Sequence, residues 1–249
     1  MKRFTILLVV LVSLLVCSYG FPVFAQPWQG IKKKVDKSGE KTNEYAEEIE
    51  RIYDPLKSFN RAMFQFNDKL YFYVLKPVAK GYKAVLPEMV RVSVRKALSN
   101  AQMPVRVVNC ILQGKLCYTV NELARFTINT TWGIAGLFDP AKSYLHIEKH
   151  EEDFGQTLGF YGLKEVFPIT WPFLGPSNVR DTIGLVGDFF TDPVIYVEPI
   201  IKSGTSTLNV INETSLTLGD YEEFKASAID PYISLCDAYF QYRKKQIQE

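Results

Sequence analysis

One predicted helix, over residues 54–82, carries apolar side chains on two sides, and this limits the possible folds more than any other segment. Asp54 and Pro55 are typical of a helix start. One stripe, at helical spacing, comprises Phe59, Ala62, Met63, Phe66, Leu70, Tyr73 and Val74. About 120° away, at roughly 100° of rotation per residue, a second stripe comprises Phe64, Tyr71 and Leu75. Such a helix lies either within a protein core or between protein and lipid, and the spacing alone does not separate the two cases.

Helical spacing recurs along most of the chain. Pro104 opens a predicted helix that ends near Gly114, and Asp230-Pro231 opens another whose C-terminal end is cationic. Two apolar stripes indicate two further helices. One stripe, opposite Arg91 and Arg95, comprises Met89, Val90, Val94, Ala97 and Leu98, and the other comprises Leu116, Val120, Leu123 and Thr127. Between Phe138 and Pro199, frequent Gly and Pro predict short helices, turns and irregular backbone. We therefore expect a mostly α, single domain over residues 51–249 with amphipathic, interfacial helices.

The first 50 residues differ from the rest of the chain. Residues 1–25 combine Lys2 and Arg3 with an apolar run and end in Val23-Phe24-Ala25, which is typical of a secretory signal peptide cleaved after Ala25. Leu14 to Cys17 is an alternative signal, for lipid attachment to Cys17, although Val16 is unusual in it; we favour cleavage after Ala25. Residues 26–50 are rich in Lys and Glu and are interpreted as a polar tether.

Charge gives no indication of a nucleic-acid partner. The whole chain has 29 basic and 27 acidic residues, and removal of Lys2 and Arg3 with the signal peptide leaves 27 of each. Three cysteines follow the signal: Cys110, Cys117 and Cys236. If the first two share a helix, their Cα atoms lie roughly 10 Å apart, too far for a disulfide bond. Gly114 leaves that helix open to a break, so we favour isolated buried thiols over a bond.

The two histidines of the chain, His146 and His150, suggest a metal site with Glu151 or Asp153. Two observations disfavour it: the H-E-x-x-H pattern of helical zinc hydrolases is absent, and polar side chains leading into a turn explain the same residues. The sequence also lacks the phosphate-loop pattern G-x-x-x-x-G-K-[ST] and the nucleophile pattern G-x-S-x-G. We therefore expect no cofactor and no enzymatic activity.

Five stretches, in this order, resemble the MlaA (VacJ) family of bacterial outer-membrane phospholipid-transport proteins. They are "DPLKSFNRAMFQFND" (54–68), "LKPVAKGY" (75–82), "RFTINTTWGIAGLFDPA" (125–141), "EDFGQTLGFYG" (152–162) with "PFLGPSNVRDTIG" (172–184), and "DPYISLCDAYFQYR" (230–243). The resemblance implies a ring-like helical protein in the periplasmic leaflet of the outer membrane, with a channel that takes phospholipids from the outer leaflet. It also implies two partners, a trimeric porin and a soluble periplasmic lipid carrier, MlaC.

The resemblance also favours a lipid-facing position for the second stripe, Phe64, Tyr71 and Leu75, with Phe59, Phe66 and Leu70 facing protein. Trp132, Ile134, Leu137 and Phe138 are candidates for contact with acyl chains or the channel wall, against an equally good interpretation as an ordinary core hairpin. Residues expected to have structural roles in the family motifs are Asn60, Arg61, Asn67, Arg125, Asn129, Asp153, Gly155, Gln156, Gly159, Arg180 and Asp181. Arg125, Arg180 and Asp181 fit either buried ion pairs, which we favour, or contact with lipid phosphate.

Three hypotheses follow. The first is a non-enzymatic phospholipid conduit, which offers a polar path to a charged headgroup while the acyl chains stay in lipid. The second is a porin-associated structural protein without its own conduit. The third, and the weakest, is a lipid hydrolase that uses His146 or His150.

Overall fold

The computed structural model describes residues 53–193 and 199–248, so the predicted signal peptide and tether lie outside the described residues. The fold is mostly helical and forms a single domain. Its helices are α4 (Lys57–Leu70), η1 (Tyr71–Leu75), α5 (Lys76–Val85), α6 (Glu88–Ala101), α7 (Met103–Leu112), α8 (Leu116–Thr131), α9 (Pro140–Ser143), α10 (Phe154–Phe160), α11 (Val179–Thr191), α12 (Pro199–Leu216), α13 (Asp220–Ser227) and α14 (Pro231–Gln248).

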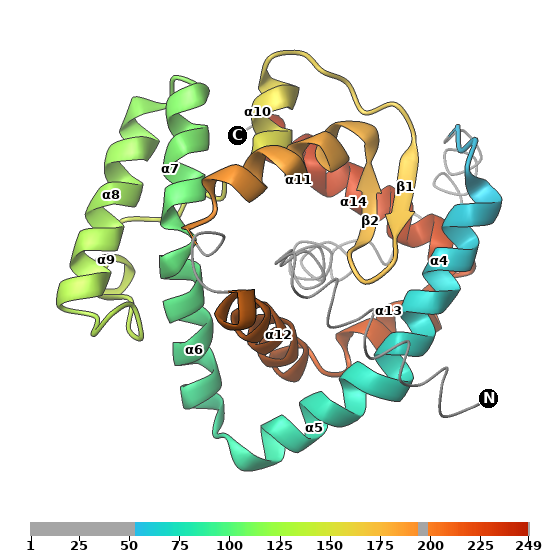
Figure 1. The fold of residues 1–249 in the computed structure, drawn as a ribbon, viewed down its shortest axis with the longest axis horizontal. Helices are drawn as coiled ribbons and strands as arrows, with labels where there is room; N and C mark the ends of the chain where they lie inside the picture. Colours follow the sequence, from blue (N-terminus) through green and yellow to red (C-terminus); the bar gives the residue numbers. More distant parts are fainter. Residues whose placement is uncertain (1–52, 194–198, 249) are drawn as a thin grey trace.

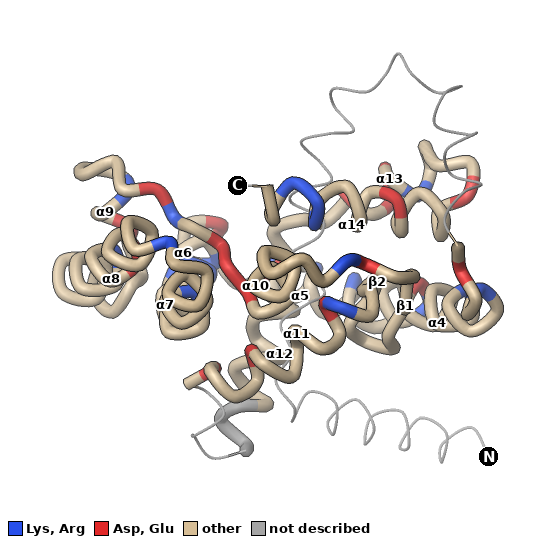
Figure 2. Tube along the Cα trace, turned by 90° about the horizontal axis from the view of Figure 1, so that it is seen from above, with Lys and Arg blue, Asp and Glu red and all other residues tan. Residues whose placement is uncertain are grey.

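Helices α4 to α7 follow one another around the perimeter of the molecule, and α11 with an antiparallel hairpin returns the chain to α4 (Figure 1). The hairpin pairs β1 (Pro168–Trp171) with β2 (Gly175–Asn178). Helix α12 packs against α5 and α6 inside this arrangement. Seen from the side, α13 and α14 form a second layer over one face (Figure 2). The ring-like, mostly α fold that the sequence predicted is therefore confirmed.

Two asparagines join α4 to the hairpin. Asn60 Nδ2 donates to the Pro168 carbonyl (2.9 Å), and Asn60 Oδ1 accepts from the Thr170 amide (2.8 Å). Seven residues later, Asn67 binds the Trp171 carbonyl and the Phe173 amide in the same way. Each side-chain amide thus pairs with the hairpin backbone as a peptide group would, which satisfies polar groups that no further strand reaches.

The perimeter bends where α4 meets α5, and Pro77 accounts for the bend. Proline lacks the N–H that would bind the carbonyl four residues earlier, and its ring crowds that carbonyl. The preceding turn is widened into the π-helix η1, in which the Lys76 amide donates to the Tyr71 carbonyl, five residues back.

The lipid-facing position expected for Phe64 and Tyr71 was wrong, whereas Phe66, expected to face protein, packs against Phe173. Tyr71, expected to face lipid, is buried and donates to Glu222 (2.8 Å); Phe64 packs against Phe224 and Leu235. Tyr73 of the stripe expected to face protein is 79% exposed. The reason is that Asn60, Phe64, Asn67 and Tyr71 share one face at helical spacing, and a search for apolar residues alone misses the two buried asparagines.

The same inversion occurs on the next helices of the perimeter. Helix α6 is confirmed, but Arg91 is 4% exposed and binds the Ser215 carbonyl, whereas Met89 of the apolar stripe is 78% exposed. The buried residues of α8 are Thr119, Glu122, Arg125 and Asn129, and its exposed ones include Leu116, Val120 and Leu123. These helices present apolar faces outward and polar faces inward.

Helices α13 and α14 have the ordinary orientation. They bury Tyr221, Phe224, Tyr232, Leu235 and Tyr239 against the ring. The start predicted at Asp230 is confirmed, because its carboxylate accepts from the Tyr232 and Ile233 amides. Within the described residues, no helix combines the length and the apolar character needed to cross a membrane.

Glycines allow α10 and α11 to touch backbone to backbone. A Cβ placed on Gly184 would lie 2.5 Å from the Gly155 amide nitrogen and 2.7 Å from its Cα. Asp153 caps α10 by accepting from the Gln156 amide (2.8 Å), and Asn178 caps α11 in the same way. The close contact fixes the relative position of two capped helices.

Replacement of Gly184 tests this contact. We expect Gly184→Ala to destabilise the fold by about 1–3 kcal/mol, because backbone atoms cannot yield to the added methyl group. The control is Gly81→Ala in α5, where nothing lies within 4 Å of the new Cβ, and where a gain of about 0.4–1 kcal/mol is expected. Thermal unfolding of both variants in detergent measures the difference. Equal midpoints would contradict the proposed packing constraint.

Candidate functional site

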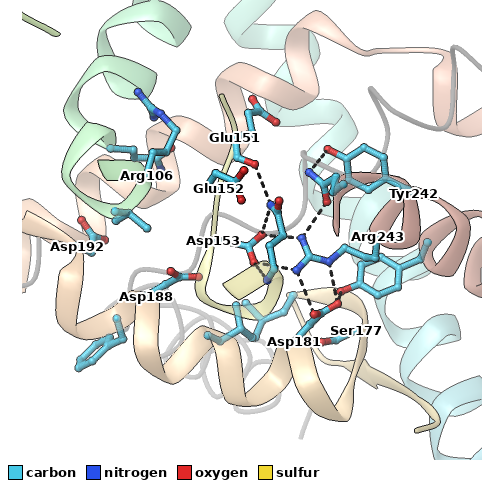
Figure 3. A pocket seen from close by; sticks show the side chains of 18 of the residues that line it. Arg106, Glu151, Glu152, Asp153, Ser177, Asp181, Asp188, Asp192, Tyr242 and Arg243 are labelled. Carbon is cyan, nitrogen blue, oxygen red and sulfur yellow. Dashed lines mark hydrogen bonds and ion pairs between the residues drawn. The ribbon is translucent and has the colours of Figure 1, made fainter. Parts of the chain in front are cut away.

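The structure contains two adjoining cavities. One has a volume of about 160 Å³ and is drawn in Figure 3; the other has a volume of about 400 Å³. Their linings share Gln102, Arg106, Lys149, Glu151 and Tyr242, so the two spaces meet at these side chains. They form the candidate site.

The smaller cavity, here called the acidic chamber, has six carboxylate and three cationic residues in its lining. The carboxylates are Glu151, Glu152, Asp153, Asp181, Asp188 and Asp192, and the cations are Arg106, Lys149 and Arg243. The larger cavity, the basic chamber, has the opposite balance. Its cations are Arg95, Lys96, Arg106, Arg125, Lys142 and Lys149, and its carboxylates are Asp139, Glu151 and Glu213.

Arg243 holds the wall of the acidic chamber together (Figure 3). Its guanidinium group donates to Asp153 (2.6 and 2.8 Å) and to Asp181 (2.9 and 3.0 Å), so it connects α14 to the N-terminus of α10 and to α11. Burial alone would raise the pKa of Asp153, but the Arg243 charge lowers it to about 2. Tyr239 adds a hydrogen bond to Asp181 (2.7 Å).

Asp188 differs from this paired group. Its Oδ1 accepts from Asn109 Nδ2 (3.0 Å) and from the Phe154 amide (2.9 Å), and both donors are neutral. Burial, with the negative charge of Asp153 nearby, raises the pKa of Asp188 to about 7, against weaker opposing effects of the hydrogen bonds from Phe154 and Asn109 and of the Arg243 charge. The chamber therefore holds one carboxyl group that changes charge near neutral pH.

Most cations that line the basic chamber are paired. Arg125 forms an ion pair with Asp139 (2.8 Å) and donates to the Ile147 carbonyl; Asn129 Nδ2 also donates to Asp139 (2.9 Å). Arg106 pairs with Glu122 (2.6 Å), which is completely buried. The ion pairs that the sequence favoured for Arg125 and for Arg180 with Asp181 are present.

The other residues of the family motifs lie at contacts between elements. Arg61 pairs with Asp230 at the start of α14 (2.5 Å), and Gln156 binds Asp153 and the Glu151 carbonyl. A Cβ on Gly155 would reach Asp181 and Arg243, and a Cβ on Gly159 would reach Ile247. Of these motif residues, Arg125, Asn129, Asp153, Gln156 and Asp181 line a chamber.

The loop after α8 exposes apolar side chains. Trp132 is 74% exposed, Ile134 and Phe138 are also exposed, and Leu137 is half-buried. Ile134 and Ala135 have left-handed backbone, and Gly136 (φ 87°) lies against Asn100, where a Cβ would meet that side chain. None of the four predicted residues lines a chamber, and Phe64, Tyr71 and Leu75 do not line one either.

The histidine cluster is dispersed. His150 stacks on Tyr118, with ring centroids 3.7 Å apart, and its amide donates to Glu122; His146 has left-handed backbone. In the described part of the chain, no group of three His, Cys, Asp or Glu side chains is arranged to hold a metal ion.

The three described cysteines are free thiols. Cys110 and Cys117 lie on separate helices, because Gly114 (φ 71°) ends α7. The expectation of buried thiols was wrong for Cys117, which is exposed. Burial raises the pKa of Cys110 to about 11 and that of Cys236 to about 12.

Sequence reasoning missed Asp188, Lys96 and the inward role of Arg243. Asp188 did carry a signal, since it is a lone acidic residue within the apolar run "TIGLVGDFF". A charge in an otherwise apolar helix segment indicates a buried polar contact. Arg243 belongs to the C-terminal segment for which the sequence indicated only a helix with a cationic end.

The charge change at Asp188 predicts a pH-dependent effect of Asp188→Asn. The unfolded-state pKa of Asp is about 3.9, below the folded value of about 7, so the wild-type protein loses stability as pH rises between these values. Asparagine keeps an acceptor for Asn109 and Phe154 but carries no charge. We expect the variant and the wild type to unfold at similar temperatures at pH 4, and the variant to unfold at a higher temperature at pH 8. A difference that does not change with pH would contradict the assignment, and Asp237→Asn, outside both cavity linings, is the control.

Comparison with known proteins places this geometry in a family. The profile of the MlaA lipoprotein family matches residues 52–246. The chain is 33% identical over 193 residues to the intermembrane phospholipid transport system lipoprotein MlaA of Escherichia coli, and the match covers 76% of each chain. It is 28% identical over 212 residues to the Haemophilus influenzae protein of the same name, a match that covers 80% of this chain and 81% of that protein. An uncharacterized protein of Rickettsia felis is 32% identical over 199 residues, 79% of each chain.

A solved structure gives the same result. Described as "Structural basis for maintenance of bacterial outer membrane lipid asymmetry", it includes a chain that is 31% identical and has a TM-score of 0.70. The match covers 78% of the present chain and 99% of that chain. The family profile, the relatives and the fold agree: this chain belongs to the MlaA family.

Proposed function

We propose that this protein is an outer-membrane component of intermembrane phospholipid transport, and that it removes misplaced phospholipids from the outer leaflet through its polar interior. The Escherichia coli relative is named for intermembrane phospholipid transport, and the matching structure is described as the basis of outer-membrane lipid asymmetry. Both support transport and lipid asymmetry as the general function. The proposal has three further parts. The protein is exported by a signal peptide and lies in the periplasmic leaflet of the outer membrane. It works beside a trimeric porin and transfers lipid to a soluble MlaC-like carrier.

The observation that carries the proposal is the reversed amphipathicity of the perimeter. Met89, Val120 and Val186 are exposed on the outside, while Arg91, Glu122 and Asp181 are buried inside. Lipid acyl chains can solvate the exposed apolar surface, and the buried charged side chains can interact with a charged headgroup. A phospholipid moving along the ring would keep its tails in lipid while its headgroup exchanges water for the charged lining.

This function requires no covalent chemistry. Movement of a headgroup past fixed charges lowers a barrier without a nucleophile, a metal or a nucleotide, so we propose a non-enzymatic role. Net direction then depends on the partners that deliver and remove lipid.

A bulky substitution in the basic chamber separates a conduit from a structural porin partner. Ser99 lines this chamber on α6, and Ser99→Trp would fill part of its space of about 400 Å³. Ser93→Trp, on the same helix but outside both linings, is the matched control. Each variant is expressed in a strain that lacks the gene, and outer-leaflet phospholipid, protein abundance and association with the porin are measured.

We expect Ser99→Trp to leave phospholipid in the outer leaflet at the level of the deletion strain, with normal abundance and porin association. Ser93→Trp should restore asymmetry as the wild type does. Restoration by Ser99→Trp would favour the structural role, and no change of asymmetry on deletion of the gene would contradict transport itself.

A further inference from the structure

The basic chamber has the size and the charge of a binding site for an anion. Its volume of about 400 Å³ lies within the range of roughly 300–1,000 Å³ that is typical of ligand pockets, whereas the acidic chamber, at about 160 Å³, lies below that range. Six cationic and three acidic residues line the basic chamber. A cavity with this balance of charge favours a negatively charged ligand.

Lys96 on α6 carries the charge of this lining that no carboxylate of the described residues offsets. The other five cations of the lining each form an ion pair: Arg95 with Glu213, Arg106 with Glu122, Arg125 with Asp139, Lys142 with Glu148 and Lys149 with Glu151. Lys96 can therefore bind an anion without first losing a carboxylate partner, a loss that is costly for a buried pair.

Contacts place further donors beside Lys96. Ser99, three residues later, shares its face of α6, and the Cβ atoms of such residues lie roughly 5–6 Å apart. The Ser99 hydroxyl forms no hydrogen bond with the described residues. Arg106 donates from Nη1 to the Ser99 carbonyl (2.8 Å) and from Nε to Glu122 (2.6 Å), which leaves Nη2 without a hydrogen bond to the described residues. An ammonium, a hydroxyl and a guanidinium group thus gather around one turn of α6.

Helix α12 adds a neutral donor close to the same turn. Arg95, four residues before Ser99, pairs with Glu213 of α12 (2.7 Å) and so fixes the distance between the two helices. Asn209 lies four residues before Glu213, on the same face of α12, and also lines the chamber. Its side-chain amide forms no hydrogen bond with the described residues. The amide N–H groups are therefore available to a ligand.

A phosphate group is the chemical complement of these side chains. Each group named on this wall can donate hydrogen bonds, and the oxygens of a phosphodiester carry a negative charge and only accept them. Lys supplies the charge as a compact ammonium group, and the free Nη2 of Arg106 supplies a directed donor. Every glycerophospholipid carries this phosphate, whatever the rest of its headgroup.

We propose that the wall formed by Lys96, Ser99, Arg106 and Asn209 is a phosphate site inside the conduit. The interior then selects phospholipids by the phosphate that they share and does not hold lipids without one. This inference rests on the proposed function and names the chemical group that its interior recognises. Free phosphate offers the same chemistry, so the experiment separates the two sources.

The experiment measures the lipids that the interior holds. Purified full-length mature protein is incubated with vesicles of equal parts phosphatidylethanolamine and phosphatidylglycerol that also contain a small fraction of diacylglycerol with identical acyl chains. Bound lipid is quantified by mass spectrometry relative to the vesicle composition. The Ser99→Trp protein gives the lipid bound to the outer surface alone, and this amount is subtracted. Thermal unfolding of each variant checks the fold.

We expect the wild type to enrich both phospholipids over diacylglycerol, and to hold the two phospholipids within about twofold of each other because they share the phosphate. Lys96→Gln should lower bound phospholipid about tenfold, the effect of one charge-assisted hydrogen bond. Lys96→Arg, which keeps the charge, should retain most of the binding. The control Lys164→Gln removes an exposed lysine outside both linings and should change nothing.

Three results would overturn the phosphate site while leaving transport in place: equal enrichment of diacylglycerol, unchanged binding by folded Lys96→Gln, or an equal loss in Lys164→Gln. Wild-type protein that holds no more lipid than Ser99→Trp would instead contradict the conduit itself. Inorganic phosphate at the concentration of the lipid should not displace the lipid, because acyl chains add apolar contacts. Displacement would assign the site to a free anion and overturn its role in lipid binding.

Discussion

The contact of Arg243 with Asp153 and Asp181 is the interaction on which the interior of this protein depends. One guanidinium group from the last helix neutralises the cap of α10 and a carboxylate of α11, all within the acidic chamber. Removal of one partner from such a buried cluster typically costs about 3–5 kcal/mol, because the remaining charges have no water to solvate them. Gly155 is required beside it, since a Cβ there would lie 2.6 Å from Asp181 and 2.7 Å from Arg243.

Paired charges also explain how a ring can be polar inside. The buried side chains of the described residues include Arg91, Arg106, Glu122, Arg125 and Arg180, each with a hydrogen-bond or ion-pair partner. Pairing offsets the cost of burial, and under the proposed function the surrounding lipid would solvate the apolar outer faces. The layer of α13 and α14 covers one face with ordinary apolar packing, so the reversed pattern is confined to the perimeter.

Sequence periodicity located the helices because helical spacing does not depend on which side faces the solvent. The direction of each face does depend on it, which is why Phe64 and Tyr71 were assigned to the lipid side although they share a buried face with Asn60 and Asn67. The β1–β2 hairpin was missed within the Gly- and Pro-rich segment, because its strands are four residues each and are completed by asparagine side chains from α4. The motif residues Arg125, Asp153 and Asp181 were identified by resemblance, whereas Asp188 and Lys96 acquire meaning only when α6, α7 and α11 come together.

The central claim is that the outer faces of the perimeter helices contact lipid. After Cys117→Ser, spin labels placed at Val120 on α8 and at Glu223 on α13 can be compared in membrane vesicles by their collision rates with oxygen and with a water-soluble nickel complex. Both positions are exposed in the structure. The label at Val120 should collide mainly with oxygen, which concentrates in lipid, and the label at Glu223 mainly with nickel. A label at Val120 that collides with nickel as readily as the label at Glu223 would show that the apolar perimeter does not lie in the membrane.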